Sequence, residues 1–156
     1  MNPAAWAQAL LRALGVPVTA GGTAILVAWQ ACEGGVAAQQ GFNPLNTTEP
    51  APGSRPLPGN PAGVQLYPSA PVGVAATAAT LTNGRYPTIL AALRTGQPAR
   101  LATAAGVAEI ATWGTDPACL LGRLGLRAPR PGGGPAWGPL VAIVVGVPLV
   151  WALRRR

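Results

Sequence analysis

The sequence predicts a mainly α-helical domain with a long ordered loop or short hairpin, followed by a linker and a C-terminal transmembrane helix. Three observations support this prediction. Apolar and alanine-rich runs with capping residues at their starts recur between residues 3 and 124. The 21 glycines and 18 prolines predict short elements joined by ordered loops. Residues 136–153 form an uncharged, mostly apolar run, near the ~20 residues needed to cross a bilayer.

Two helices are predicted at the start of the chain. The first covers residues 3–14, with an asparagine before it as a cap and a glycine after it as a stop signal. The second is capped by Thr19 or Thr23 and runs to about Cys32. The short Val-Pro-Val segment between them is the connector.

Glu33 is the most informative residue of the chain. Leu26, Trp29 and Glu33 are spaced i, i+3 and i+7, so they share one helical face, which is predicted to point into the core. A carboxyl at the edge of apolar packing favours its protonated form, and a protonated carboxyl near neutral pH can act as a general acid. An ordinary acid near a helix end fits the same position, so the residues after Glu33 must decide between the two interpretations.

A long segment with little periodicity comes next, over residues 34–66. A structureless loop of this length in a small domain is usually functional or disordered. We expect an ordered substrate-binding loop, with a short hairpin or extended piece near residues 63–67. The apolar anchors that favour order are Phe42, Leu45, Val64, Leu66 and Tyr67.

Four helices are predicted after the loop. The first opens at Ser69 or Pro71, and the last is capped by Asp116. Glycine-containing pairs are predicted to end the first and second of them. The predicted ranges are 72–81, 86–93, 99–112 and 117–124.

The C-terminal part is predicted to be a linker and a membrane anchor. Residues 127–135 are rich in glycine and proline, as linkers are. Trp137 and Trp151 mark the ends of the apolar run 136–153, as an aromatic belt would. The run Arg154–Arg156 should stay on the cytoplasmic side or its equivalent, which places the domain of residues 1–126 on the opposite side. A buried C-terminal core helix is the alternative.

The charge pattern favours a membrane or cell-wall partner over nucleic acid. The formal net charge is +7, and arginine alone supplies the positive charge. Apart from the C-terminal cluster, the arginines are scattered along the chain, which is unlike a DNA-binding stripe. The excess positive charge favours approach to an anionic wall or lipid surface. We therefore expect no nucleic-acid partner.

Histidine is absent from the chain, which bears on catalysis and metal binding. Its absence excludes a Ser-His or Cys-His nucleophilic pair and argues against a zinc site. We expect neither a metal nor a cofactor. Cys32 and Cys119 fit either a disulfide in an oxidising compartment or two buried reduced thiols.

Three short motifs succeed one another in the predicted domain: Trp29-x-x-x-Glu33-Gly34, Asn43-Pro-Leu-Asn-Thr-Thr48 and Gly-Val-Gln-x-Tyr67. Together they resemble the lysozyme-like, lytic-transglycosylase-like muralytic domain of phage endolysins and virion proteins. The resemblance covers residues 4–124 and leaves out the linker and the apolar tail. A proline-rich insertion around residues 55–61 departs from the pattern and is expected to alter the rim of the cleft.

The resemblance implies roles for individual residues. Glu33 is expected to be the catalytic acid that donates a proton to the glycosidic oxygen. Glu49 is the candidate for a second carboxylate, since Glu109 is predicted to face solvent and Asp116 to cap a helix. Polar loop residues are expected to bind the glycan, although such side chains also commonly hold loops together. They are Asn43, Asn46, Thr47, Thr48, Gln65 and Tyr67.

The expected function is that of a membrane-anchored phage peptidoglycan-degrading enzyme, either a lytic transglycosylase or a lysozyme. Its expected partners are the glycan strands, a lipid membrane bound through residues 136–153, and other virion proteins. The expected location is a virion membrane or the host cell envelope. The alternative is a non-enzymatic structural membrane protein of the virion that keeps a lysozyme-like domain for glycan binding or assembly. A holin-like pore protein fits less well, because one span accompanies a large domain.

Overall fold

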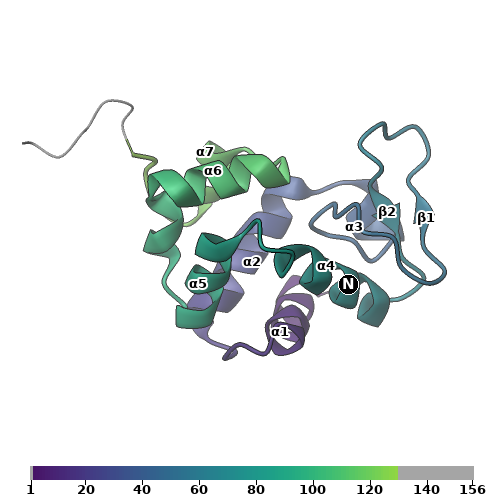
Figure 1. Cartoon of the computed structure of the whole chain (residues 1–156), viewed down its shortest axis with the longest axis horizontal. Helices are drawn as coiled ribbons and strands as arrows, with labels where there is room; N and C mark the ends of the chain where they lie inside the picture. Colours follow the sequence, from purple (N-terminus) through teal and green to yellow (C-terminus); the bar gives the residue numbers. More distant parts are fainter. Residues whose placement is uncertain (1, 130–156) are drawn as a thin grey trace, which may run out of the picture.

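Helices dominate the computed structural model, which describes residues 2–129 (Figure 1). The predicted mainly helical class is confirmed. In chain order the described elements are α1 (Pro3–Ala13), α2 (Ala20–Glu33), α3 (Val36–Gln40), β1 (Arg55–Pro56), β2 (Gln65–Leu66), α4 (Ala70–Leu81), α5 (Pro87–Thr95), the 3-10 helix η1 (Pro98–Ala102), α6 (Ala104–Trp113) and α7 (Pro117–Arg123).

Local capping chemistry sets the first two helices, as predicted. The Asn2 side chain accepts hydrogen bonds from the first backbone N–H groups of α1. The Thr19 side chain accepts one from the Gly22 N–H at the start of α2. At the other end of α2, Gly34 has a φ of +49°, a conformation that favours glycine. The chain therefore leaves the helix directly after Glu33.

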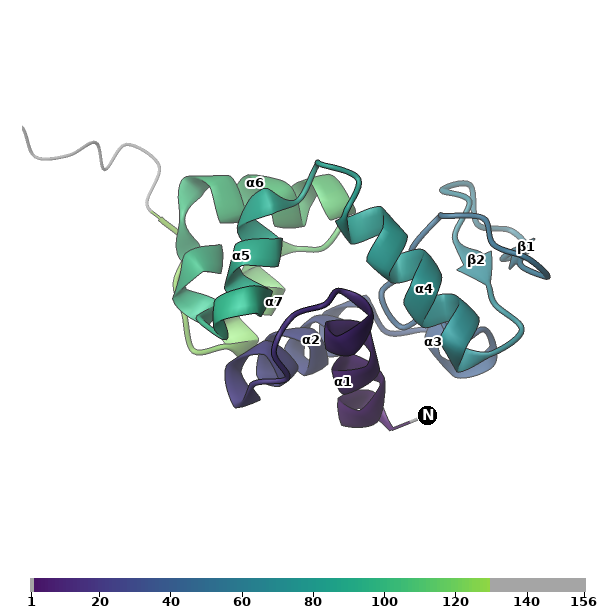
Figure 2. The same ribbon diagram turned by 60° about the horizontal axis from the view of Figure 1, so that its bottom comes forward.

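The main core lies among the helices. α1 packs against α2 and α4, and α2 packs against α5 and α7 (Figure 2). The predicted inward face of α2 is confirmed, because Leu26 and Trp29 are both 0% exposed. Glu33, on the same face, is half-buried at the end of the helix. The Glu33 carboxylate therefore lies at the edge of the apolar core.

A small hairpin lobe stands at the opposite end from α5, α6 and α7 (Figure 1). β1 and β2 pair antiparallel, with Arg55 opposite Leu66, so the predicted extended piece near residues 63–67 is confirmed. The lobe has its own apolar cluster, formed by Ala37, Val64 and Leu66. The one-turn helix α3 beneath it is not predicted by the sequence, because five residues are too few for a periodic pattern.

The predicted single helix over residues 99–112 is wrong. Instead, η1 ends at Ala102 and α6 begins at Ala104. Thr103 separates them with an extended backbone, at φ −86° and ψ 162°. Its hydroxyl accepts from the Gly106 N–H and so caps α6. The alanine-rich composition hides this cap, because helix propensity alone favours a continuous helix.

The prediction that Glu109 faces solvent is also wrong. Glu109 is 9% exposed and lies on α6 against the start of α5. Its two carboxylate oxygens accept hydrogen bonds from the backbone N–H groups of Thr88 and Ile89, at 2.9 and 2.8 Å. The residue before α5, Tyr86, provides no side-chain cap. Glu109 therefore caps α5 from a neighbouring helix, where a negative charge is also favoured by the helix dipole.

We expect Glu109→Gln to lower the stability of the domain by ~1–3 kcal/mol, because it removes one charge-assisted acceptor from a buried site. The variant should unfold at a lower urea concentration with an unchanged slope of unfolding free energy against urea. An unchanged midpoint would mean that the cap adds nothing to stability.

The predicted transmembrane helix, residues 136–153, lies outside the described residues, as does Arg154–Arg156. Within residues 2–129, no helix has both the length and the apolar character needed to span a bilayer.

Candidate active site

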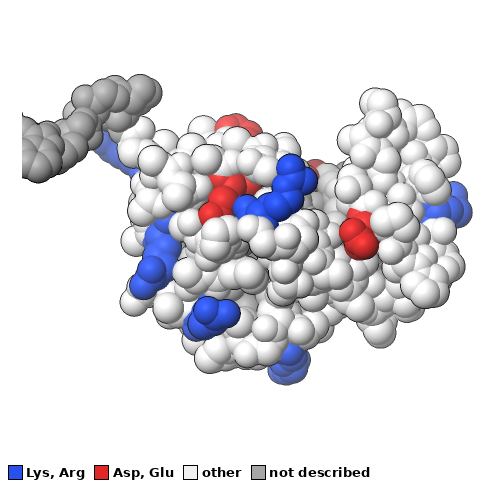
Figure 3. Space-filling model, in the orientation of Figure 1, with Lys and Arg blue, Asp and Glu red and all other residues white. Residues whose placement is uncertain are grey.

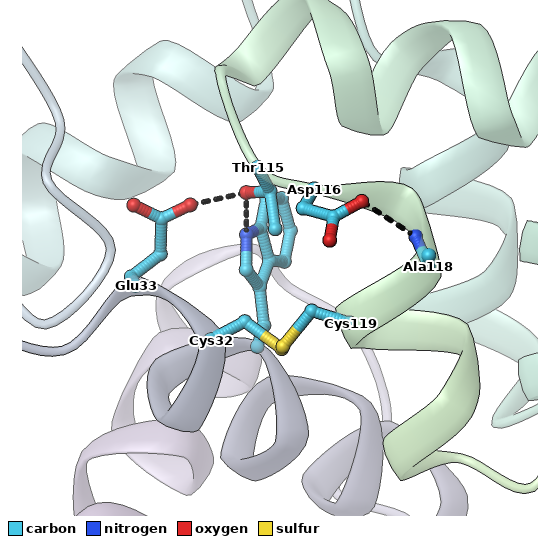
Figure 4. The surroundings of a disulfide bond; sticks show 7 residues. Cys32, Glu33, Thr115, Asp116, Ala118 and Cys119 are labelled. Atoms are coloured by element: carbon cyan, nitrogen blue, oxygen red, sulfur yellow. Dashed lines mark hydrogen bonds between the residues drawn. A yellow bond between two sulfur atoms is a disulfide. The ribbon is translucent and has the colours of Figure 1, made fainter.

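The Glu33 carboxylate is held from two sides at the C-terminal end of α2. Its Oε2 atom accepts a hydrogen bond from the Asn46 side-chain amide at 2.8 Å. Its Oε1 atom accepts one from the Thr115 hydroxyl (Figure 4). One donor comes from the loop after α3, and the other from the connection between α6 and α7. Three segments that are distant in sequence thus meet at one half-buried acid.

Trp29 and Trp113 contact the two segments that donate hydrogen bonds to Glu33. The Trp29 indole N–H donates to the Thr115 hydroxyl oxygen at 2.6 Å. The rings of Trp29 and Trp113 pack edge to face, with centroids 5.0 Å apart. The Trp113 ring also packs against Tyr86, which confirms the predicted packing role of that tyrosine. Trp29 therefore hydrogen-bonds directly to Thr115, one of the two donors to Glu33.

Asn46 is positioned by its own backbone and by its neighbour. Its φ is +53°, and Phe42 in the same loop has a φ of +46°. Non-glycine residues rarely adopt such values, and strain of this kind often accompanies functional sites. The Trp113 indole N–H donates to the Leu45 carbonyl at 2.7 Å, just before Asn46. The loop is thus fixed where it presents its amide to Glu33.

Helix α4 packs closely against the loop that contains Phe42 and Asn46. A Cβ added at Gly73 would lie 2.1 Å from the Phe42 carbonyl oxygen, so only glycine permits this approach. The side-chain oxygens of Thr47 and Thr80 are 2.7 Å apart, which links the loop to α4 a second time. Phe42 itself remains 38% exposed.

Asn43 organises the loop from inside. It is 0% exposed. Its amide nitrogen donates to the carbonyls of Thr47 and Gln65, each at 2.8 Å, and its oxygen accepts from the Thr47 N–H at 2.9 Å. These hydrogen bonds hold the loop together, which is the alternative role of the polar loop residues, and glycan binding by Asn43 stays a prediction.

Most of the other predicted glycan contacts also turn inward. Thr47, Gln65 and Tyr67 are 2%, 7% and 3% exposed. Gln65 binds Ser54 and the Gly63 carbonyl within the hairpin lobe. The structure therefore brings only Asn46 into contact with Glu33, and it leaves Thr48 exposed. Glycan binding by these residues stays a prediction.

Tyr67 and Glu49 form a second polar pair at the loop. The Tyr67 hydroxyl donates to the Glu49 backbone carbonyl at 2.6 Å. Burial, and secondly the negative charge of Glu49, raise the pKa of Tyr67 well above its usual value. Tyr67 thus remains a protonated donor at neutral pH. The exposed Glu49 is the candidate second carboxylate, a role that stays a prediction.

The disulfide alternative is the one that the structure contains. Cys32 and Cys119 are bonded, with their Cα atoms 6.0 Å apart. The bond joins the last turn of α2 to α7 beside the contact between Glu33 and Thr115 (Figure 4). It therefore connects the two segments that carry the acid and its hydroxyl donor.

Thr115 and Trp113 are not among the predicted site residues. They belong to the run Trp113-Gly-Thr115 at the end of α6. Gly114, between them, has a φ of +102° and reverses the chain. Sequence spacing marks this run only as a helix stop. Its role at the site depends on tertiary contacts.

The distribution of charge and of metal-ligating side chains is a further feature of the described part of the chain. On the face shown in Figure 3, charged side chains are few and scattered over a mostly uncharged surface. Within residues 2–129, histidine, cysteine and acidic side chains do not gather in threes or more where they could hold a metal ion.

The search for similar proteins found no match to the chain among family models, curated sequences or solved structures.

Proposed function

We propose that residues 1–126 form a lysozyme-like domain that cleaves the glycan strands of peptidoglycan, with Glu33 as the catalytic acid. One observation supports this most strongly: the half-buried Glu33 carboxylate accepts hydrogen bonds from two neutral donors on separate segments. A general acid must be fixed in direction, yet open to its substrate. The two hydrogen bonds and the partial exposure of Glu33 support this role.

In this proposal Glu33 acts twice. Its protonated carboxyl first donates the proton to the glycosidic oxygen as the bond from the anomeric carbon to that oxygen breaks. The resulting carboxylate is stabilised by Asn46 and Thr115. It then takes a proton from the attacking hydroxyl, which forms the new bond to the anomeric carbon. The cycle leaves Glu33 protonated and requires neither a metal nor a cofactor.

The distribution of acids favours lytic transglycosylation over hydrolysis. The chain has four acidic residues. Glu109 and Asp116 are engaged as caps of α5 and α7. The two side chains bonded to Glu33 are an amide and a hydroxyl, which cannot serve as a second carboxylate. Attack by the sugar's own 6-hydroxyl needs no such partner, whereas hydrolysis would depend on the exposed Glu49.

We therefore expect the released muropeptides to end in 1,6-anhydromuramic acid. Mass spectrometry of a digest by the full chain in detergent separates the two outcomes, because the anhydro product lacks one water. Reducing ends alone would exclude transglycosylation. If Glu49→Gln then also stopped cleavage, Glu49 would be the base that activates water, a role that needs the two carboxyls roughly 6.5–9.5 Å apart.

The proposed setting is a membrane. Residues 136–153 would anchor the protein in a virion membrane or the host cell envelope, with the catalytic domain on the side opposite Arg154–Arg156. Such an anchor would hold a wall-cleaving domain where a phage particle or lysis system meets the wall, alongside other virion proteins.

A zymogram with the full chain on purified cell walls tests the proposal against its alternative. Clearing of the wall supports the enzyme. Binding to the wall without clearing, by a folded protein, supports a non-enzymatic virion protein that uses the domain to bind glycan.

A further inference from the structure

We infer that Thr115 is a positioning residue that fixes the Glu33 carboxylate and stabilises it as it loses its proton. The inference rests on the proposed function of Glu33. It names a residue from the connection between α6 and α7, outside the three motifs that carry the resemblance.

The direction of the contact is set by the number of protons available. A threonine hydroxyl has one hydrogen to donate. The Trp29 indole N–H is only a donor, and it points at the Thr115 oxygen from 2.6 Å. The hydroxyl therefore accepts from Trp29, and its single hydrogen is directed to Oε1 of Glu33. Thr115 thus meets the acid as a donor, which is the partner that a carboxylate prefers.

The hydrogen bonds that link Trp29, Thr115 and Glu33 are shielded from water, and the segments that carry them are tied together. Trp29 is 0% exposed and Thr115 is 5% exposed, so water competes little for either group. Thr115 precedes α7, whose start is capped by Asp116 through the Ala118 N–H at 2.9 Å. The Cys32–Cys119 disulfide ties α7 to the turn that carries Glu33. The hydroxyl is therefore held at one place relative to the acid.

Two side chains donate hydrogen bonds to the Glu33 carboxylate, and each bonds a different oxygen. Asn46 reaches it from the loop and Thr115 from the end of α6, and both are uncharged. The carboxylate of Asp116 points away from Glu33, toward Ala118 (Figure 4). Thr115 is thus the donor to Oε1, and its loss should loosen the orientation of the Glu33 carboxyl.

The test replaces Thr115 with valine, which keeps the shape and removes the hydroxyl. In the full chain, Thr115→Val should lower kcat roughly 10- to 100-fold on glycan-strand fragments, with little change in KM. Thr115→Ser keeps the hydroxyl and should restore kcat toward the wild-type value.

Thr77→Val is the matched control. Thr77 is also buried, at 0% exposure, and its hydroxyl donates to the Gly73 carbonyl within α4. The same loss of a buried hydroxyl there should leave kcat and KM unchanged.

The outcomes separate the two claims. If the wild type cleaves peptidoglycan, but Thr115→Val matches it in kcat, the inference about Thr115 is wrong and the proposed function stands. If the wild type cleaves no peptidoglycan, the proposed function fails, and the inference fails with it. A lower kcat at an unchanged KM, reversed by serine and absent from Thr77→Val, supports both.

Discussion

Glu33→Gln is expected to reduce wall cleavage ~10²–10⁴-fold, the usual cost of losing a general acid. The glutamine keeps the shape of the side chain and can still accept from Thr115, but it has no acidic proton to give to the glycosidic oxygen. The fold should survive, because the core contacts of α2 are made by residues such as Leu26 and Trp29. Clearing rates on purified walls measure the loss, and thermal melting of the same samples reports the fold.

Glu109→Gln is the control for this variant. It makes the same chemical change at the cap of α5, in a carboxylate bonded to Thr88 and Ile89 rather than to site residues. Below its melting temperature it should cleave walls at about the wild-type rate. A folded Glu33→Gln protein that cleaves as fast as Glu109→Gln would show that Glu33 is not the acid.

Most of the side-chain caps could be predicted from the sequence, although the alanine-rich run around Thr103 hides the cap of α6. Asn2, Thr19 and Asp116 cap the helices that begin after them, because a cap depends on residues within one turn. The placement of Glu33 beside the core also came from spacing on α2 alone. Both kinds of inference use contacts between residues that are close in the chain.

The partners of Glu33 required the tertiary fold. Asn46 is expected from the sequence to bind substrate, and the structure adds that it holds the acid. Thr115 lies 82 positions after Glu33, and no local pattern connects the two. The sequence misplaces Glu109 for the same reason, because the N–H groups that it caps belong to another helix.

The polar loop residues show a different limit. An asparagine that binds a sugar and one that holds a loop have the same side chain, so residue type does not distinguish the two roles. Their burial also cannot be deduced from residue type: Asn43 is 0% exposed, whereas Thr48 lies at the surface. The pairing of the cysteines is likewise open until the fold places α7 against α2.

That pairing leads to the second large expected effect. Replacing both Cys32 and Cys119 with alanine should lower the stability of the domain by ~2–5 kcal/mol. The disulfide joins positions that are 87 residues apart, so its loss frees a long stretch of the unfolded chain. Urea unfolding of the wild type and the double variant measures the difference.

The double variant should also cleave walls more slowly, even where it remains folded. Cys32 directly precedes Glu33, and Cys119 lies in α7, which begins just after Thr115, so the bond is expected to help hold the donor against the acid. A reducing agent should lower the unfolding midpoint and the activity of the wild type toward those of the double variant, and should leave the double variant unchanged. Equal urea midpoints for the two oxidised proteins would mean that the Cys32–Cys119 bond does not stabilise the domain. Equal cleavage rates would mean that the packing of α7 on α2 holds Thr115 in place without it.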